Sequence, residues 1–274
     1  MTSNTTVTII TGASEGIGAE LARQLATRYG TGLRLVLAAR KREALDAVAD
    51  ICRAKGSQVL VVPTDVSVEA QCRALIQTTI DAFGRIDTLV NNAGVSAQAL
   101  FQDVDAQDLH WYEDLMRVNL WGSVWCTHAA LPHIKQAQGR IVAVSSLAGL
   151  IGVPGRTAYS ASKFAMTGFF EALRAELKPS GVSVTTAFPG VVLTDIRAHG
   201  LNAKGEVAGS SGLKEDKAMT VSECAYLIAT GMQKRQREVV MTAQGKLGRF
   251  LKLLLPGVVE NMAMAALKDE VKPK

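Results

Sequence analysis

Short apolar runs alternate along the chain with longer segments of helical periodicity, and this alternation constrains the fold more than any other feature. The runs are nearly continuous in Val, Ile and Leu, which is typical of strands buried on both faces. Repeated strand–helix order predicts an α/β fold: a doubly wound, Rossmann-type parallel sheet of about seven strands, flanked by helices on both faces, in a single domain over 1–274. The expected strands are Val7–Ile10, Leu33–Ala38, Val59–Val62, Thr88–Val90, Ile141–Val144 and Ser183–Ala187, and the expected helices are Ile17–Tyr29, Lys41–Ala54, Glu69–Phe83, Asp108–Ile134 and Ala158–Lys178.

Composition and charge exclude several classes of protein. The chain is 48% hydrophobic and 20% charged, which is too apolar for a disordered chain. Its net charge of +5 arises in the segment 232–274. No nucleic-acid module or aromatic-bearing basic face accompanies that charge, so no nucleic-acid partner is predicted. Polar residues interrupt the long uncharged stretches, and therefore no transmembrane segment is predicted either.

The cysteines, the histidines and the first residues bear on metal binding and location. The four cysteines form no CxxC pair and the four histidines show no ligand spacing, so no metal site is predicted. The first ten residues lack the basic start and apolar core of a secretion signal. These features predict a cytoplasmic protein whose thiols stay reduced.

A glycine-rich turn follows the first expected strand. Residues 11–18 read TGASEGIG and lead directly into the first expected helix. Glycine lets the backbone approach a pyrophosphate, and the helix N-terminus offers N–H groups to the phosphates. Because strand and helix flank the turn in the right order, a dinucleotide site is favoured over a plain strand–helix turn. The expected contacts are Gly12, Ser14, Glu15, Gly16, Ile17 and Gly18.

Several motifs, in order, resemble those of the short-chain dehydrogenase/reductase family. They are the GxxxGxG spacing of the turn, the NNAG sequence at residues 91–94, Ser146 followed by Tyr159 and Lys163, and Pro189-Gly190 with Thr194. Together they extend over roughly residues 7–195, and ordered agreement of several motifs is far more specific than any one alone. VSSLAG, YSASKFA and GFF are most similar to the branch of eleven-beta-hydroxysteroid dehydrogenases and related carbonyl reductases.

The resemblance implies further contacts with a dinucleotide. It places Asp65 and Val66 at the adenine, although a helix-capping role for Asp65 is an alternative. It places Asn91 and Gly94 at the adenosine ribose with Ala93 beside them, while Asn92 is expected to tether neighbouring backbone. On the nicotinamide side it implies Tyr159, Lys163, Pro189, Gly190, Val192 and Thr194.

The end of the second expected strand favours NADPH/NADP+ as the cofactor. Ala39 stands where NAD-using members of the family usually carry Asp, and Arg40 and Lys41 follow it. A guanidinium fork suits the 2′-phosphate that distinguishes NADP from NAD. Glu15 argues against this choice, because many NADPH-using relatives carry a basic residue at that place. The alternative is that Arg40 merely faces solvent.

Tyr159 and Lys163 are four residues apart and therefore share one helix face. A neighbouring ammonium lowers the pKa of a phenol, so Tyr159 is predicted to donate a proton in reduction and accept one in oxidation. Ser146 is predicted to polarise a carbonyl rather than to attack it, because no nucleophilic triad accompanies it. By resemblance Asn119 is the fourth catalytic residue, placing a water that relays protons to Lys163, and Lys163 also holds the nicotinamide ribose. An Asn119 amide bonded to its own helix backbone is compatible with that role.

The substrate pocket is expected to be lined mainly by small or apolar side chains, which suits a hydrophobic ketone, aldehyde or alcohol. Arg156 and Arg197 are the cations available for a carboxylate or phosphate. The aperiodic segment 195–219 is predicted to be a substrate lid, with a merely tolerated insertion as the alternative. The expected pocket residues are Ser96, Ser146, Leu147, Val153, Tyr159 and Val191.

Two further features concern assembly. The expected helices over Trp111–Ile134 and Ala158–Lys178 are apolar on more than one side, which predicts a homodimer or homotetramer. The basic C-terminal extension, 245–274, combines a Leu-rich face with Lys and Arg. It is suited to peripheral membrane contact, and packing over the pocket or against a subunit is favoured over that.

These patterns together predict an NADPH-dependent oxidoreductase that reduces a ketone or aldehyde to an alcohol. One alternative is an NAD(P)-dependent alcohol or hydroxysteroid dehydrogenase working in the oxidative direction. Another is a non-catalytic dinucleotide sensor on the same fold. Retention of Asn119 and Ser146 argues against the sensor, because binding alone requires neither.

Overall fold

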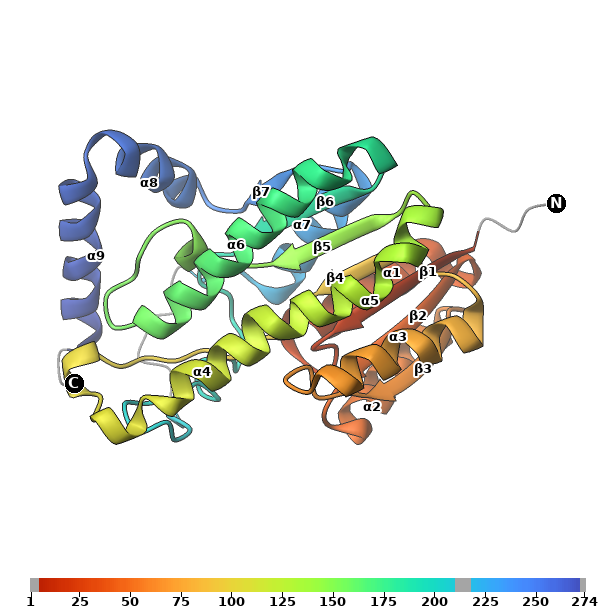
Figure 1. Ribbon diagram of the computed structural model, residues 1–274, viewed down its shortest axis with the longest axis horizontal. Coiled ribbons are helices and arrows are strands. Elements are labelled where there is room, and N and C mark those ends of the chain that lie inside the picture. Colours follow the sequence, from red (N-terminus) through yellow and green to blue (C-terminus); the bar gives the residue numbers. More distant parts are fainter. Residues whose placement is uncertain (1–4, 210–217, 272–274) are drawn as a thin grey trace.

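The computed structural model describes residues 5–209 and 218–271 of the chain (Figure 1). Its strands form one parallel sheet in the order β3-β2-β1-β4-β5-β6-β7. This confirms the doubly wound sheet predicted from the sequence. The strands are β1 Thr6–Thr11, β2 Leu33–Ala39, β3 Gln58–Pro63, β4 Thr88–Asn91, β5 Arg140–Val144, β6 Ser183–Phe188 and β7 Glu238–Val240.

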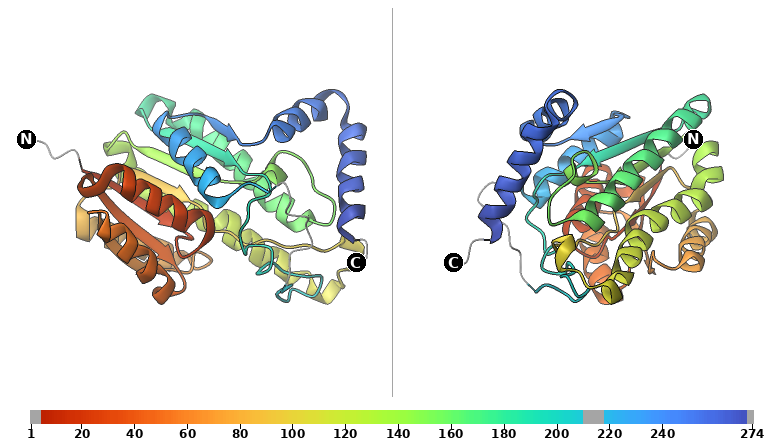
Figure 2. Two further views of the ribbon diagram at one scale, coloured as in Figure 1. Left: turned by 180° about the vertical axis from the view of Figure 1, so that it is seen from behind. Right: turned by 60° about the vertical axis from the view of Figure 1, so that its left-hand side comes forward.

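Helices cover both faces of the sheet, as Figures 1 and 2 show. Apolar residues of α1, α2 and α7 form one core with the sheet, and those of α3, α5 and α6 form a second core on its other face. Strands covered on both sides need apolar side chains at nearly every position, which explains their unbroken Val, Ile and Leu content. The helices are α1 Gly16–Tyr29, α2 Arg42–Ala54, α3 Glu69–Phe83, α4 His110–Met116, α5 Gly122–Gln136, α6 Thr157–Leu177, α7 Val221–Gln233, α8 Ala243–Leu254 and α9 Pro256–Val271.

The chain reverses its direction across the sheet between β1 and β4. From β1 the first half of the chain builds outward to β3, and the second half then returns to β4 and builds outward to β7. The loops that leave β1 and β4 therefore diverge at their carboxyl ends. Open α/β sheets bind ligands in the crevice that forms at such a reversal.

The helix expected over Asp108–Ile134 is interrupted in its middle. A π-helical segment, η4 (Arg117–Trp121), joins α4 to α5. A π-turn adds one residue to a helical turn and frequently marks a functional site. The insertion leaves the apolar pattern continuous, so the pattern alone does not indicate it.

The C-terminal extension folds as α8 and α9, which project beyond the sheet (Figure 1). Large apolar side chains remain exposed on both helices, among them Phe250 at 58% and Leu253 at 79%. Within the described residues, no helix combines the length and apolar character needed to cross a membrane.

Candidate active site

A continuous cavity of about 1320 Å³ opens at the carboxyl ends of the central strands. It is larger than the roughly 300–1,000 Å³ of ordinary small-molecule pockets, so it has room for an extended ligand and a second molecule. The predicted site residues that line it are Gly12, Ser14, Glu15, Gly16, Ile17, Arg40, Lys41, Asp65, Val66, Ala93, Gly94, Ser96, Ser146, Leu147, Val153, Tyr159, Lys163, Pro189, Gly190, Val191, Val192 and Thr194.

The glycine turn is fastened to the end of β4. Gly12 has a φ of +64°, and a Cβ there would lie 2.8 Å from the Ala93 Cα atom. The Asn92 side chain donates to the carbonyl oxygens of Thr11 and Gly12, at 3.0 and 3.1 Å. The Thr11 hydroxyl in turn accepts from the Asn92 and Ala93 amides. These bonds fix the backbone at the N-terminus of α1, where the first N–H groups of the helix have no intrahelical partners and suit an anion.

Replacing Gly18 with alanine is expected to destabilise the protein by about 1–3 kcal/mol or more, because a Cβ there would collide with the Gly12 carbonyl oxygen and lie 2.5 Å from the Asn92 amide nitrogen. Gly168→Ala is the matched control, since Gly168 lies inside α6 and a Cβ at that position would have no other atom within 4 Å. That variant is expected to gain roughly 0.5–1 kcal/mol of stability. Urea unfolding of both variants tests the pair, and equal effects would contradict it.

Two of the residues expected at the dinucleotide lie outside the cavity lining. Asn91 is buried behind the sheet, and its side-chain amide donates to the Thr127 hydroxyl of α5 at 2.9 Å. The Asn91 side chain therefore joins β4 to α5, and the contact between Asn91 and the adenosine ribose stays a prediction. Gly18 packs beneath the turn, against the Gly12 carbonyl oxygen, and does not line the cavity.

Ser146, Tyr159 and Lys163 meet at one place in the cavity. Ser146 directly precedes the short helix η5 (Leu147–Gly149), and its hydroxyl accepts from the Ala148 amide at 3.2 Å. Tyr159 lies in the first turn of α6 and lines the cavity together with Ser146. The neighbouring Ser145 hydroxyl donates to the Lys163 carbonyl oxygen at 3.2 Å. That bond holds the loop after β5 against α6 and so sets the distance between the serine and the tyrosine.

Comparison with known proteins agrees with this geometry. Residues 6–204 match the sequence pattern described as short chain dehydrogenase. The chain belongs to the short-chain dehydrogenase/reductase family. It is 35% identical over 269 residues to the 11-beta-hydroxysteroid dehydrogenase-like 2 of Arabidopsis thaliana, covering 97% of this chain and 83% of that protein.

One further relative and one solved structure are also similar to this chain. The 11-beta-hydroxysteroid dehydrogenase-like 4A of Arabidopsis thaliana is 47% identical over 190 residues. That match covers 69% of this chain and 62% of the relative, so the chain spans less than two thirds of that relative's length. The crystal structure of a short-chain dehydrogenase/reductase from Burkholderia phymatum, in complex with NAD, superimposes with a TM-score of 0.79 at 26% identity. The superposition covers 93% of this chain and 95% of the Burkholderia phymatum chain.

In this short-chain dehydrogenase/reductase the pKa of Tyr159 is raised rather than lowered. Burial is the main cause, and it outweighs the hydrogen bond from Ser146 and the positive charges of Arg156 and Arg197, which lower that pKa. A raised pKa keeps the phenol protonated at neutral pH. This protonation state is the one that a proton donor needs.

Lys163 is not among the groups that shift the pKa of Tyr159 in this structure, and the lowering expected from Lys163 together with the cationic nicotinamide ring stays a prediction. The Lys163 Nζ atom lies 5.8 Å from the centroid of the Tyr159 ring and donates to the Val144 carbonyl oxygen at 3.0 Å. Burial lowers the pKa of Lys163 itself to about 8. The lysine is therefore anchored to β5, with its amine at the floor of the cavity.

Asn119 lies in η4, is fully buried and does not line the cavity. Its side-chain oxygen accepts from the Val95 amide at 2.8 Å, and its side-chain nitrogen donates to the Val95 carbonyl oxygen at 3.0 Å and to the Ser162 hydroxyl at 2.9 Å. The amide thus bonds the loop after β4 and helix α6 rather than its own helix. Its own carbonyl oxygen accepts from the Ser123 hydroxyl at 3.3 Å.

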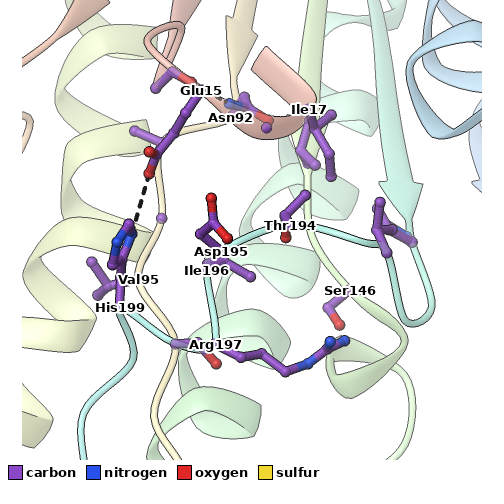
Figure 3. Close-up of a pocket in the computed structure, with 18 of the residues that line it drawn as sticks. Glu15, Ile17, Asn92, Val95, Ser146, Thr194, Asp195, Ile196, Arg197 and His199 are labelled. Carbon is purple, nitrogen blue, oxygen red and sulfur yellow. Dashed lines mark hydrogen bonds and ion pairs between the residues drawn. The ribbon is translucent and has the colours of Figure 1, made fainter. Parts of the chain in front are cut away.

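Glu15 has a partner that sequence patterns did not indicate. Its carboxylate forms an ion pair with His199 at 3.5 Å, which joins the glycine turn to the segment after β6 (Figure 3). The described part of the expected lid, 195–209, carries His199 and other lining residues, and positions 210–217 lie outside the described residues. Asp65 lines the cavity and also accepts from the Ser67 amide and hydroxyl.

Helix α8 supports the loop that carries Ser146. The Leu147 side chain packs so closely on Gly245 that a Cβ on that glycine would overlap it. The Lys252 Nζ atom donates to the Leu150 carbonyl oxygen at 2.9 Å and lies 4.7 Å from the centroid of the Phe164 ring. The C-terminal extension therefore packs against the loop that carries Ser146, and its packing over the pocket stays a prediction. No local sequence signal pairs Lys252 with Leu150.

The described residues hold no group of three or more His, Cys, Asp or Glu side chains arranged to bind a metal ion. The residues that the cavity does offer fit a dinucleotide. The floor of the cavity is formed by the backbone at Gly12, by the N-terminus of α1 and by the Lys163 amine. The exposed cations Arg40 and Lys41 lie at its rim.

Proposed function

We propose that the chain is an NADPH-dependent oxidoreductase that reduces a ketone or aldehyde to an alcohol. The observation that carries this proposal is that Ser146, Tyr159 and Lys163 line the same cavity as the glycine turn. A dinucleotide held by the turn and a carbonyl compound at the serine would then lie side by side in one site, the proximity that a transfer between them requires.

The roles of the side chains follow from their chemistry. The dinucleotide, when bound, supplies the hydride that reduces the carbonyl carbon. The Ser146 hydroxyl donates a hydrogen bond to the carbonyl oxygen and stabilises the negative charge that develops there. The protonated Tyr159 phenol gives its proton to that oxygen. By family resemblance Lys163 holds the nicotinamide ribose, and Asn119 places a water that relays protons to Lys163.

The preference for NADPH rests on the end of β2. Arg40 and Lys41 are exposed at the cavity rim, and Ala39 offers no carboxylate to repel a phosphate. The acidic Glu15 in the glycine turn is paired with His199, which offsets its charge when the histidine is protonated. A bidentate guanidinium is well suited to a ribose 2′-phosphate.

Arg40→Ala is expected to raise the KM for NADPH roughly 10- to 100-fold, the effect of losing a charge-assisted hydrogen bond, with little change for NADH. The measurement is the oxidation rate of each cofactor with a panel of aryl ketones, steroids and acyl thioesters. Arg42→Ala is the control, because Arg42 pairs with Asp46 at 3.7 Å. A wild-type preference for NADH would overturn the cofactor assignment.

Assembly and surface contact follow as proposals of the same kind. The exposed Trp121 of η4 stacks on Trp125 of α5, with the two ring centroids 5.9 Å apart. Exposed aromatic surface of this kind favours a homodimer or homotetramer. The exposed apolar residues of α8 and α9 suit peripheral contact with a lipid surface.

A further inference from the structure

Helix α8 contacts the substrate side of the cavity through the side chain of Leu147. Leu147 directly follows Ser146 and lines the cavity, whereas Gly245 of α8 does not line it. A Cβ on Gly245 would overlap the Leu147 Cδ2 atom and would lie 3.0 Å from the Leu147 Cδ1 atom. The glycine therefore leaves free the space that the end of the leucine side chain fills.

The backbone at Gly245 does not itself require glycine. Gly245 lies in the first turn of α8, and its φ is in the ordinary range that any residue adopts. Alanine is more favourable than glycine in a helix, because glycine loses more backbone freedom on folding. The close packing of Leu147 is thus the reason that the structure offers for a glycine at this place.

Helix α8 and the loop after β5 are fastened to each other, so they do not readily separate to admit a methyl group. The Lys252 Nζ atom donates to the Leu150 carbonyl oxygen at 2.9 Å. The Leu147 backbone is held as well, because its amide donates to the Pro189 carbonyl oxygen at 2.9 Å. The end of the leucine side chain is the part that can shift, and the space open to it is the cavity that it lines.

We propose that Gly245 is a specificity-determining residue, which sets through Leu147 how bulky a group the pocket accepts beside the substrate carbonyl. Gly245→Ala would press the leucine side chain into the space beside Ser146, where the carbonyl would lie. Gly245 acts through another side chain, so it is a positioning residue rather than a catalytic one. This assignment rests on the proposed carbonyl reduction and adds to it a limit on substrate size that the C-terminal extension supplies.

The test uses aryl ketones that grow only beside the carbonyl: acetophenone, propiophenone and isobutyrophenone. With NADPH, Gly245→Ala is expected to lower kcat/KM for isobutyrophenone about tenfold or more, the discrimination that a methyl group supplies in a close-fitting pocket. The same variant is expected to change kcat/KM for acetophenone by about threefold at most, because Ser146 and Tyr159 are untouched. Comparing each ketone between variant and wild type cancels its own reactivity. Gly257→Ala on α9 is the control, since a Cβ there would have no other atom within 4 Å.

Leu147→Val combined with Gly245→Ala distinguishes crowding of the pocket from a general disturbance of α8. Valine lacks both Cδ atoms, so the double variant adds one carbon and removes one, and such volume-conserving changes are well tolerated. It is expected to return the ratio of isobutyrophenone to acetophenone reduction to within about threefold of the wild type. Leu147→Val alone is expected to raise that ratio, a result that tests the assignment even if Gly245→Ala does not fold. An equal loss for all three ketones, or a selective loss that Leu147→Val does not reverse, would overturn the assignment.

Calorimetry of the same ketones with the NADP+-loaded protein separates this proposal from the proposed reduction. Binding of isobutyrophenone that weakens about tenfold or more in Gly245→Ala and recovers in the double variant supports the role of Gly245. If no ketone is reduced, that binding result would overturn the reductase assignment and leave the size limit standing. Reduction of all three ketones with the same ratios in Gly245→Ala as in the wild type would overturn the role of Gly245 and leave the reductase standing.

Discussion

Tyr159→Phe is expected to lower kcat for ketone reduction by about 10²–10⁴-fold, the usual contribution of a positioned general acid. The substitution removes only the phenolic oxygen, so the alkoxide that forms on reduction loses its proton source. The ring remains buried on α6, in the cavity that Ser146 also lines. Binding of NADPH, followed by its fluorescence, is expected to change by less than about threefold, because the turn that holds the phosphates is untouched.

Tyr112→Phe is the matched control for that experiment. Its hydroxyl is also hydrogen-bonded, to the Thr157 hydroxyl at 2.7 Å, but Tyr112 lies on α4 outside the cavity lining. Its kcat is expected to stay within about twofold of the wild type, since the loss of one exposed hydrogen bond has a small effect. Unchanged turnover in Tyr159→Phe would eliminate the proposed proton donor.

The protonation of Tyr159 also has a consequence for pH. Since burial raises the pKa of the phenol, Tyr159 is in its donor form throughout the neutral range. The rate of reduction is therefore expected to be insensitive to ionisation of this group near pH 7 and to fall only at alkaline pH, as the phenol loses its proton. The oxidative direction requires the phenolate and would show the opposite trend.

The sheet and the glycine turn could be predicted because their determinants are local. Buried parallel strands leave continuous apolar runs, and a phosphate-binding turn requires glycine at set places such as Gly12. The seventh strand, β7, is only three residues long, which is too short for its pattern to be recognised. The π-turn η4 inserts its extra residue without breaking the apolar pattern of the helix around it.

Several features of the site depend on contacts between distant segments. Asn91 and Asn92 are neighbours of the same residue type, but side chains alternate in direction along a strand. The alternation aims the Asn91 side chain at Thr127 and leaves the Asn92 side chain at the glycine turn, where it bonds neighbouring backbone. The direction of Arg197 depends likewise on how the segment after β6 crosses the cavity.

Lys163→Met is expected to abolish most of the activity and yet to raise the stability of the folded protein. The Lys163 side chain is 3% exposed, and burial lowers its pKa from 10.5 to about 8. A pKa shift of that size means that the buried charged amine lowers the free energy of unfolding by about 3 kcal/mol. Methionine removes the buried charge and leaves the Val144 carbonyl without its bond from Nζ, which offsets about 1 kcal/mol. The expected net gain is about 1–3 kcal/mol at pH 7.

The pH dependence of that gain identifies its cause. Below pH 8 the amine is charged in both the folded and the unfolded protein, so the full desolvation penalty applies to the wild type. Between pH 8 and 10.5 the folded protein releases its proton while the unfolded chain keeps it, and the penalty shrinks as the pH rises. Denaturant unfolding is therefore expected to show the largest advantage for Lys163→Met near neutral pH and a vanishing one toward pH 10.5.

Lys252→Met separates the loss of a buried charge from the loss of an amine–carbonyl hydrogen bond. Lys252 is half-buried, donates to the Leu150 carbonyl oxygen and lies over the Phe164 ring, so its replacement removes two favourable contacts. This control is expected to lose about 0.5–2 kcal/mol, opposite in sign to Lys163→Met. A Lys163→Met protein that is less stable than the wild type at pH 7 would show that its amine is stabilised where it lies. A stabilised variant without turnover would instead mark Lys163 as a residue kept at the expense of stability, as expected for a group held for catalysis.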